Sequence, residues 1–141
     1  MVMLEECMVF LLSKAHQRVY QMSKAELQPY GITPVQYALL HLLWEKDGQS
    51  GAELGEGMRL DSATMTGLLD RLAHHEWIKR CPDPKDRRVN RIFVTEQGRA
   101  LQHELTQVMD KINTTVLEDF TAKEAQLLKD MLIRLAAREE K

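Results

Sequence analysis

Apolar stripes on long helical segments at both ends of the chain restrict its fold more than any other feature of the sequence. Near the N-terminus, apolar residues recur at steps of three and four, the spacing of one helix face: Leu4, Met8, Leu11, Ala15, Val19 and Met22. Two similar stripes follow later, from Leu101 to Val116 and from Leu127 to Ala136. A small middle domain cannot cover all three stripes. They would pack against each other and against a second copy, so the pattern predicts a homodimer.

The middle of the chain carries the pattern of a helix-turn-helix. A short helix is predicted over residues 51–58, followed by a tight turn at 59–60. A second helix is predicted from 62 to about 75, and either Asp61 or Ser62 can cap its N-terminus. In DNA-binding proteins with two helices joined by so short a turn, the second helix lies in the major groove.

Two short strands follow this pair of helices. Residues 77–81 and 89–94 are rich in the β-branched and aromatic residues that favour strands, and prolines mark the turn between them. Together they predict a β-hairpin, or wing. An earlier helix is expected to open at Thr33, because Thr33 and Gln36 can form a capping box there.

The predicted fold is therefore a mainly α (α+β) winged helix-turn-helix with long N- and C-terminal dimerisation helices. The expected order is helix, helix, a short strand, helix, helix, strand, wing, strand, helix and helix. Within residues 1–141, taken as one unit, residues 33–95 would form the DNA-binding domain. Residues 1–31 and 96–141 would form the helical dimerisation region.

Basic residues concentrate in the predicted wing. The chain has a net charge of −2, but residues 79–91 hold six basic residues against two acidic ones, a local charge of +4. An arginine on a hairpin tip can enter the minor groove, and Asp86 could hold Arg88 extended through a charge-assisted hydrogen bond. The alternative is a solvated turn whose charges only favour solubility. We favour contact with double-stranded DNA.

Small hydroxyl residues begin the second helix of the predicted helix-turn-helix, where they can reach bases or phosphates without steric conflict. The alternative is that Ser62 and Thr64 only cap this helix. Arg71, further along, could contact a phosphate or a guanine edge. The candidate DNA-binding residues are thus Ser62, Thr64, Thr66, Arg71, Lys85, Asp86, Arg87 and Arg88.

Several of these segments resemble the MarR (multiple antibiotic resistance regulator) family. The likeness is carried by Ile32-Thr33-Pro34-Val35-Gln36-Tyr37, by Leu60-Asp61-Ser62-Ala63-Thr64-Met65-Thr66 with Leu69-Asp70-Arg71-Leu72, and by Asp83-Pro84-Lys85-Asp86-Arg87-Arg88 with Val94-Thr95-Glu96-Gln97-Gly98. The resemblance implies a two-fold dimer with one winged domain per subunit on a pseudo-palindromic operator. It implies a transcription regulator, most often a repressor, that is released by a small aromatic or phenolic effector, and Asp86 and Arg88 as a DNA-contacting pair.

An effector pocket would lie between the first, second and fifth predicted helices. The candidates combine apolar walls with polar groups, as small-molecule sites do: His16, Tyr20, Tyr37, His41 and Trp44. The alternative is that Tyr37 and Trp44 are simply core residues.

Two other hypotheses compete with a ligand-controlled repressor. One is a redox-responsive regulator acting through Cys7, because the peroxide-sensing branch of the family has a reactive cysteine in its first helix. Cys7 falls about half a helical turn too early, and Ser13 and Ser23 stand where the partner tyrosines are expected. Cys7 would then be a small interface residue, and Cys81 an inert thiol. The other hypothesis is a small-molecule-binding or interaction module without DNA activity.

Other classes of function have little support in the sequence. Motifs for a catalytic nucleophile, a phosphate-binding loop or a dinucleotide cofactor are missing, so we expect neither an enzyme nor a cofactor. The five histidines lack metal-ligand spacing, which argues against a zinc sensor. No apolar run reaches the ~18–20 residues that cross a bilayer. The segment 1–10 carries acidic residues in place of a basic leader, so we expect a cytoplasmic, nucleoid-associated protein.

Overall fold

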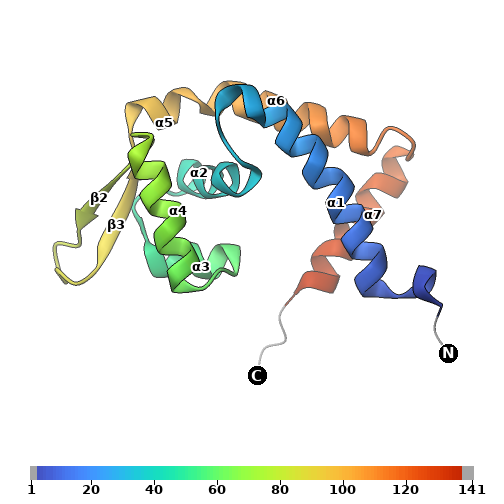
Figure 1. Ribbon diagram of the computed structural model, residues 1–141, viewed down its shortest axis with the longest axis horizontal. Helices are drawn as coiled ribbons and strands as arrows, with labels where there is room; N and C mark the ends of the chain where they lie inside the picture. Colours follow the sequence, from blue (N-terminus) through green and yellow to red (C-terminus); the bar gives the residue numbers. More distant parts are fainter. Residues whose placement is uncertain (1–2, 138–141) are drawn as a thin grey trace.

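Residues 3–137 are described by a computed structural model, in which the chain forms a winged-helix end and a helical end (Figure 1). The predicted fold class is confirmed. The elements in chain order are a short 3-10 helix (Leu4–Glu6), α1 (Met8–Leu27), a second 3-10 helix (Gln28–Tyr30), α2 (Pro34–Glu45), β1 (Gln49–Ser50), α3 (Gly51–Met58), α4 (Ser62–His74), β2 (Ile78–Pro82), β3 (Asn90–Val94), α5 (Glu96–Ala100), α6 (Gln102–Val116) and α7 (Ala122–Ala136).

Side-chain caps define where the helices begin. Thr33 accepts a hydrogen bond from the backbone N–H of Gln36, whose side chain binds the N–H of Thr33, so the predicted capping box forms at α2. Thr121 and Glu124 form a second box at α7. At α4 the cap is Asp61, which accepts from the N–H of Thr64 at 2.7 Å.

The sheet is small and antiparallel, with the strand order β1-β3-β2. Ile78 of β2 pairs with Val94 of β3, and Ile92 of β3 faces Gln49 of β1. The side chains of Ile78, Ile92 and Val94 are buried on the inner face. The β2–β3 hairpin therefore stands on the core at its base and projects beyond it at its tip.

Helix α2 occupies the centre of the winged domain, as its nearly continuous apolar sequence predicts. Leu39, Leu40 and Leu43 are completely buried, and they share one core with Leu54 of α3 and Leu72 of α4. The buried face of α2 therefore supports both helices of the helix-turn-helix from one core.

Two predicted helices differ from the structure at their ends. One helix is expected between the wing and the last helix, but the structure has two, α5 and α6, which meet at Leu101. The indole N–H of Trp44 donates to the carbonyl of Gly98 at 3.2 Å, and in a continuous helix this carbonyl would serve Gln102. The first helix also begins later than the apolar stripe from Leu4 indicates. The backbone is extended at its N-cap, so Leu4 lies in a separate turn.

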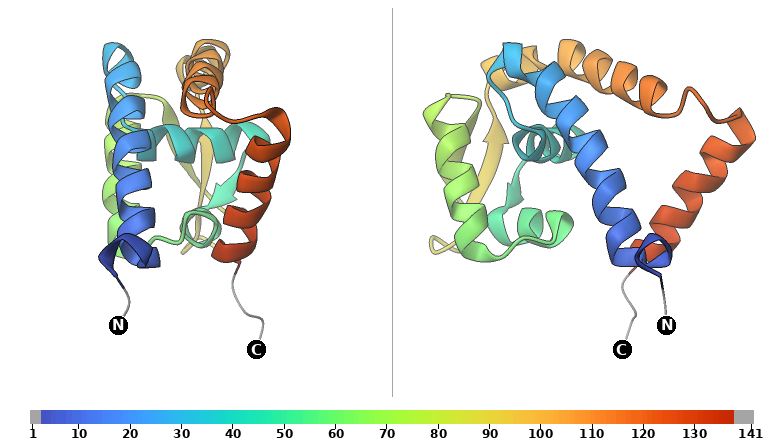
Figure 2. Two further views of the ribbon diagram at one scale, coloured as in Figure 1. Left: turned by 90° about the vertical axis from the view of Figure 1, so that its right-hand side faces the viewer. Right: turned by 45° about the vertical axis from the view of Figure 1, so that its right-hand side comes forward.

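The helical end consists of α1, α6 and α7. Helix α1 packs along α6, whereas α7 leaves the end of α6 and returns toward the start of α1 (Figure 2). Arg59, at the turn after α3, donates a hydrogen bond to the carbonyl of Ala136 at the end of α7. Within residues 3–137, no helix has the length and apolar character that crossing a membrane demands.

Candidate nucleic-acid interface

Helix α4 presents one apolar face to the core and one polar face to solvent. Its buried face is formed by Met65, Leu68, Leu69 and Leu72. The predicted contact residues Ser62, Thr64, Thr66 and Arg71 are all exposed. The hydroxyl of Thr66 donates to the carbonyl of Ser62 at 2.8 Å. The first two turns of α4 can therefore approach a nucleic acid without rearrangement.

A buried carboxylate, Asp83, fixes the hairpin where β2 passes into the loop at its tip. Asp83 accepts hydrogen bonds from the backbone N–H of Lys85 at 2.7 Å and from Nε of Arg91 at 2.8 Å. Arg91 also donates to the carbonyl of Gly48 at 3.0 Å, which ties the hairpin to the loop after α2. The hydrogen bond from the N–H of Lys85 holds the pKa of Asp83 below its ordinary value; burial opposes this shift, and the Arg91 guanidinium adds to it.

The tip of the wing has the predicted pair of Asp86 and Arg88. Asp86 accepts from both the backbone N–H and Nε of Arg88, at 3.0 and 3.2 Å. The side chain of Arg88 is nevertheless 91% exposed, so the carboxylate orients the guanidinium without covering it. Lys85 and Arg87 are exposed beside it. The tip thus offers cations in a defined direction.

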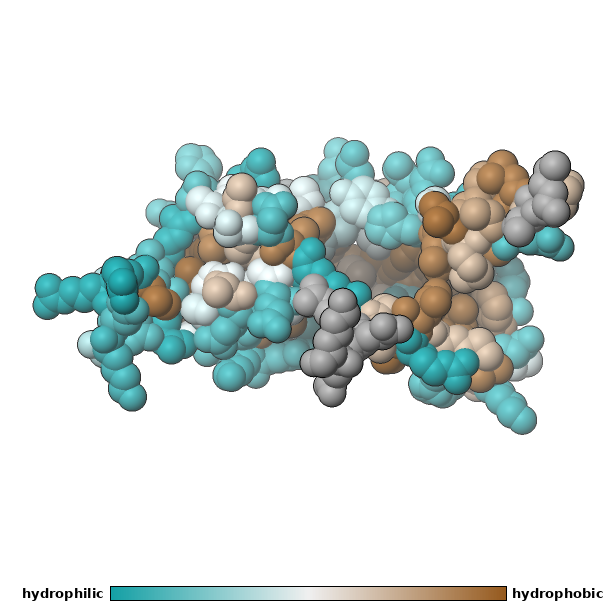
Figure 3. Space-filling model, turned by 90° about the horizontal axis from the view of Figure 1, so that it is seen from below, coloured by the Kyte–Doolittle hydropathy of each residue, from teal (hydrophilic) through white to brown (hydrophobic). Residues whose placement is uncertain are grey.

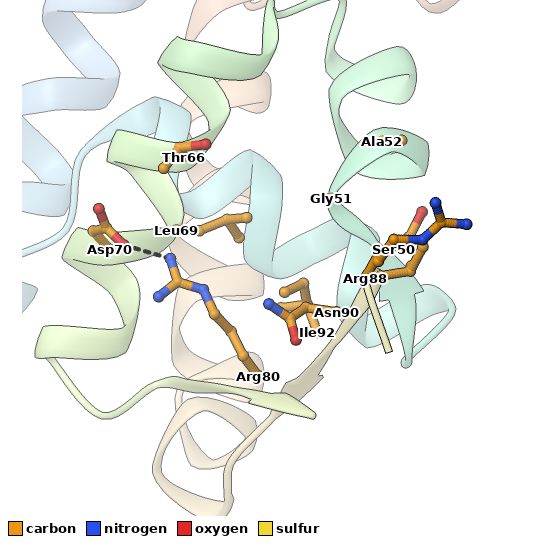
Figure 4. Close-up of a pocket in the computed structure, with 11 residues that line it drawn as sticks. Ser50, Gly51, Ala52, Thr66, Leu69, Asp70, Arg80, Arg88, Asn90 and Ile92 are labelled. Carbon is orange, nitrogen blue, oxygen red and sulfur yellow. Dashed lines mark hydrogen bonds and ion pairs between the residues drawn. The ribbon is translucent and has the colours of Figure 1, made fainter. Parts of the chain in front are cut away.

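A polar cleft of about 530 Å³ separates α4 from the wing, and Figure 4 shows its walls. Thr66 and Asp70 line it from α4, and Arg80, Arg88 and Asn90 line it from the hairpin. The structure therefore brings Thr66 and Arg88 to the same cleft. Ser62 lies with Thr66 along an adjacent groove between α3 and α4, whereas Thr64 and Arg71 line neither hollow.

Arg80 and Asp70 are residues of this cleft that the sequence reasoning did not select. Nη2 of Arg80 lies 2.6 Å from Oδ1 of Asp70, so an ion pair joins β2 to α4 (Figure 4). Arg80 belongs to the basic segment 79–91. Its partner is ten residues away on a different element, and only the packing of β2 against α4 shows it.

The effector candidates fall into two groups. Tyr37, His41 and Trp44 form an aromatic cluster on α2, with ring centroids 5.7 to 6.2 Å apart. His16 and Tyr20 pair with each other on α1, at 5.6 Å. Tyr37 and His41 line a cavity that is open to solvent and lies between α2, α3 and α6. The other three candidates do not line it, and α3 takes the place that was expected for the first helix.

Neither cysteine is paired, and both thiols are half-buried. Cys7 lies immediately before α1, and the proposed redox role of this thiol stays a prediction. Within residues 3–137, no three His, Cys, Asp or Glu side chains are grouped as metal ligands.

Comparison with known proteins assigns this architecture to a family. The sequence profile of the MarR family matches residues 32–89. YsmB, an HTH-type transcriptional regulator of Bacillus subtilis (strain 168), is 32% identical over 117 residues, which span 83% of this chain and 80% of that protein. A relative of this kind is a transcription regulator rather than an enzyme.

Solved structures of the family share the whole fold. A MarR variant from E. coli complexed with operator DNA has a TM-score of 0.85 at 24% identity, covering 90% of this chain and 91% of that one. BpsR of Bordetella bronchiseptica, a protein whose DNA binding is regulated by 6-hydroxynicotinic acid, has a TM-score of 0.92 at 22% identity, with 99% of each chain covered. This chain belongs to the MarR family and is a transcription regulator that binds DNA through a winged helix-turn-helix.

Proposed function

We propose that this chain is a homodimeric repressor that binds a pseudo-palindromic operator and leaves it when a small aromatic effector binds. The observation that carries the proposal is the common orientation of α4 and the wing. Thr66 and Arg88 line one cleft at the end of the molecule remote from α7 (Figure 1). Two such ends on one dimer would enter successive major grooves, about one helical turn apart.

The dimer is supported by apolar side chains that a single copy leaves in solvent. They lie on α7 and around the start of α1, and the space-filling view shows them as one brown region (Figure 3). The exposed residues are Met3, Leu4, Met8, Val9, Leu11 and Leu12 at one end of the chain and Leu127, Met131, Leu132, Ile133 and Leu135 at the other. A second copy would bury them, so residues 1–31 and 96–141 act as the dimerisation region and residues 33–95 as the DNA-binding domain.

DNA contacts divide by their chemistry. Ser62, Thr64, Thr66 and Arg71 would meet the major groove, while Lys85 and Arg87 would bind phosphates and Arg88 would enter the minor groove, held by Asp86. Because phosphate contacts release counterions, binding should weaken steeply with salt. Action on an operator would place the protein in the cytoplasm, with the nucleoid.

Effector control is supported by the cavity beside Tyr37 and His41, which lies where the winged domain meets α6. A ligand there would bind more tightly at one spacing of the two winged domains than at another. If the spacing that it favours does not fit the operator, the ligand weakens DNA binding.

The decisive variant is Arg88→Ala, with Lys24→Ala as its control. Lys24 is an exposed cation in the last turn of α1, and it belongs to neither α4 nor the wing. We would measure fluorescence anisotropy of a labelled duplex from the DNA flanking the gene, and confirm the dimer by sedimentation. Arg88→Ala should lose about 1–3 kcal/mol of binding free energy while remaining a dimer. Equal affinities for the two variants would refute the assignment of the wing.

A further inference from the structure

A hydrogen-bonded chain of side chains follows one face of α2 and ends at the cavity. Oε1 of Glu45 lies 2.8 Å from Nε2 of His41, and Nδ1 of His41 lies 3.3 Å from the hydroxyl of Tyr37. The carboxylate has no proton to give, so Nε2 is the donor of the first bond. In a neutral imidazole, Nδ1 then accepts the proton of the Tyr37 hydroxyl. The Tyr37 oxygen is left with free lone pairs, as a hydrogen-bond acceptor.

The cavity itself is roomy enough for one substituted aromatic ring. Its volume is about 450 Å³, and its walls come from α2, α3 and α6: Tyr37, Ala38, His41, Leu42, Gly57, Met58, Met109 and Asn113. Methionine side chains adapt to an aromatic ring and contact it favourably. Among these lining residues none is lysine or arginine, so the described walls supply no fixed cation for a carboxylate or phenolate.

Two acids act on the tyrosine at the polar end of the cavity. Asp110 is the neighbour in sequence of Met109, a lining residue on α6, and Oε1 of Glu45 lies 2.8 Å from Nε2 of the lining residue His41. Burial raises the pKa of Tyr37, and the negative charges of Asp110 and Glu45 raise it further. The field of these two carboxylates therefore favours a positive charge at this end of the cavity.

We propose that this cavity binds aromatic ligands that carry an ammonium group in preference to aromatic carboxylates. The ammonium donates to the Tyr37 oxygen and faces the acids at Glu45 and Asp110, and the ring lies between Met58 and Met109. This assignment rests on the proposed effector function and deepens it, because it names the charge of the ligand. It also departs from the phenolic effectors that the family resemblance implies.

The charges around the cavity favour a cationic ligand over an anionic one. An anion in this position would be repelled by two carboxylates and would gain no fixed opposite charge from the lining residues. An ammonium group gains a hydrogen bond, attraction to two carboxylates and the negative face of the tyrosine ring. Because of the carboxylates of Glu45 and Asp110, we expect a cationic ligand to bind about tenfold more tightly than an anionic ligand of the same shape.

The test compares three probes that share one ring: benzylamine, which is protonated at neutral pH, benzyl alcohol and benzoate. Their dissociation constants for the full-length dimer would be measured by titration calorimetry, with Trp44 fluorescence as a second readout because its ring lies beside Tyr37. We expect benzylamine to bind most tightly and benzoate least. Tyr37→Phe should weaken benzylamine binding, because it removes the acceptor.

Charge variants separate an electrostatic preference from a fit of shape. Asp110→Asn should reduce the ratio of benzylamine to benzoate affinity several-fold, by about the effect of one partly screened charge. Glu104→Gln is the control, since it removes an exposed carboxylate from the same helix that does not act on Tyr37. An unchanged ratio in Asp110→Asn would overturn the electrostatic account.

Two other results would also overturn the proposal. One is tighter binding of benzoate than of benzylamine. The other is no binding of any probe up to about 10 mM, which is beyond the weakest useful effector affinity. Operator binding by the same preparation distinguishes the two levels of inference. If the dimer binds operator and no probe, the ligand assignment fails while the repressor assignment stands. If it binds no operator, the proposed function itself fails.

Discussion

Gly98 stands at the point where the wing is joined to the dimerisation helices, and the structure requires it to be a glycine. A Cβ added at this position would lie 2.2 Å from the carbonyl oxygen of Trp77 and 2.9 Å from Cγ1 of Val94. The nearer obstacle is backbone, and it is held in place because the same carbonyl accepts from the N–H of Thr95 at 3.0 Å. A side chain at position 98 is therefore excluded by lack of space, since the backbone of Gly98 does not have a positive φ.

The cost of Gly98→Ala follows from this geometry. Overpacking a buried position costs about 1–3 kcal/mol, and a clash with fixed backbone belongs at the upper end of that range. A loss of about 3 kcal/mol should lower the melting temperature by about 10 °C in a chain of this length. The hydrogen bond from Trp44 to the Gly98 carbonyl should weaken as α5 moves away, so Trp44 fluorescence should change as well.

Gly67→Ala provides a matched control for this substitution. Gly67 lies inside α4, and a Cβ added there meets no heavy atom of the described residues within 4 Å. The variant should gain up to about 1 kcal/mol from helix propensity. Thermal unfolding of both variants would be followed by circular dichroism at one protein concentration, because the stability of a dimer depends on concentration. A Gly98→Ala protein as stable as the unmodified chain would refute the close approach of α5 to Trp77.

Three further predictions test the wing, the dimer and the response to acid. Asp86→Asn should weaken operator binding less than Arg88→Ala does, because the guanidinium remains but loses its charged partner; anisotropy would rank the two. Met131→Glu should shift the protein toward monomer in sedimentation, since it puts a charge into the exposed apolar face of α7. Backbone donors lower the pKa of Asp61 and Asp83, so their stabilisation is present above the ordinary value of 3.8 and lost as pH falls through their lower folded values. Melting curves in that acid range should show the loss, and a flat profile would contradict it.

Local signals explain why most of the secondary structure could be predicted. The capping boxes at Thr33 and Thr121 need only residues three positions apart, so the sequence determines them without knowledge of the packing. The pair of Asp86 and Arg88 is local in the same way, because its two residues are only two positions apart. Local hydrogen bonds of this kind can be predicted because few alternative partners are within reach.

Features that depend on approach between distant segments could not be predicted. The break at Leu101 involves the indole of Trp44, which is 54 residues from the carbonyl that it binds. The ion pair of Arg80 with Asp70 requires the packing of β2 on α4. Helical periodicity gives the face of each helix but not its neighbours. Periodicity therefore could not show that Met58 of α3, and not His16 of α1, lines the cavity beside Tyr37.

Charge segregation gives the chain a physical direction for its approach to DNA. The net charge is −2, and the segment 79–91 alone carries +4, so the remainder carries −6. A duplex therefore attracts the wing and repels the rest of the surface, and the field orients the dimer before any specific contact forms. The acids beside the cavity at Tyr37 belong to this negative remainder. A cationic ligand would thus be drawn to the part of the molecule that DNA avoids, and operator and effector need not compete for one surface.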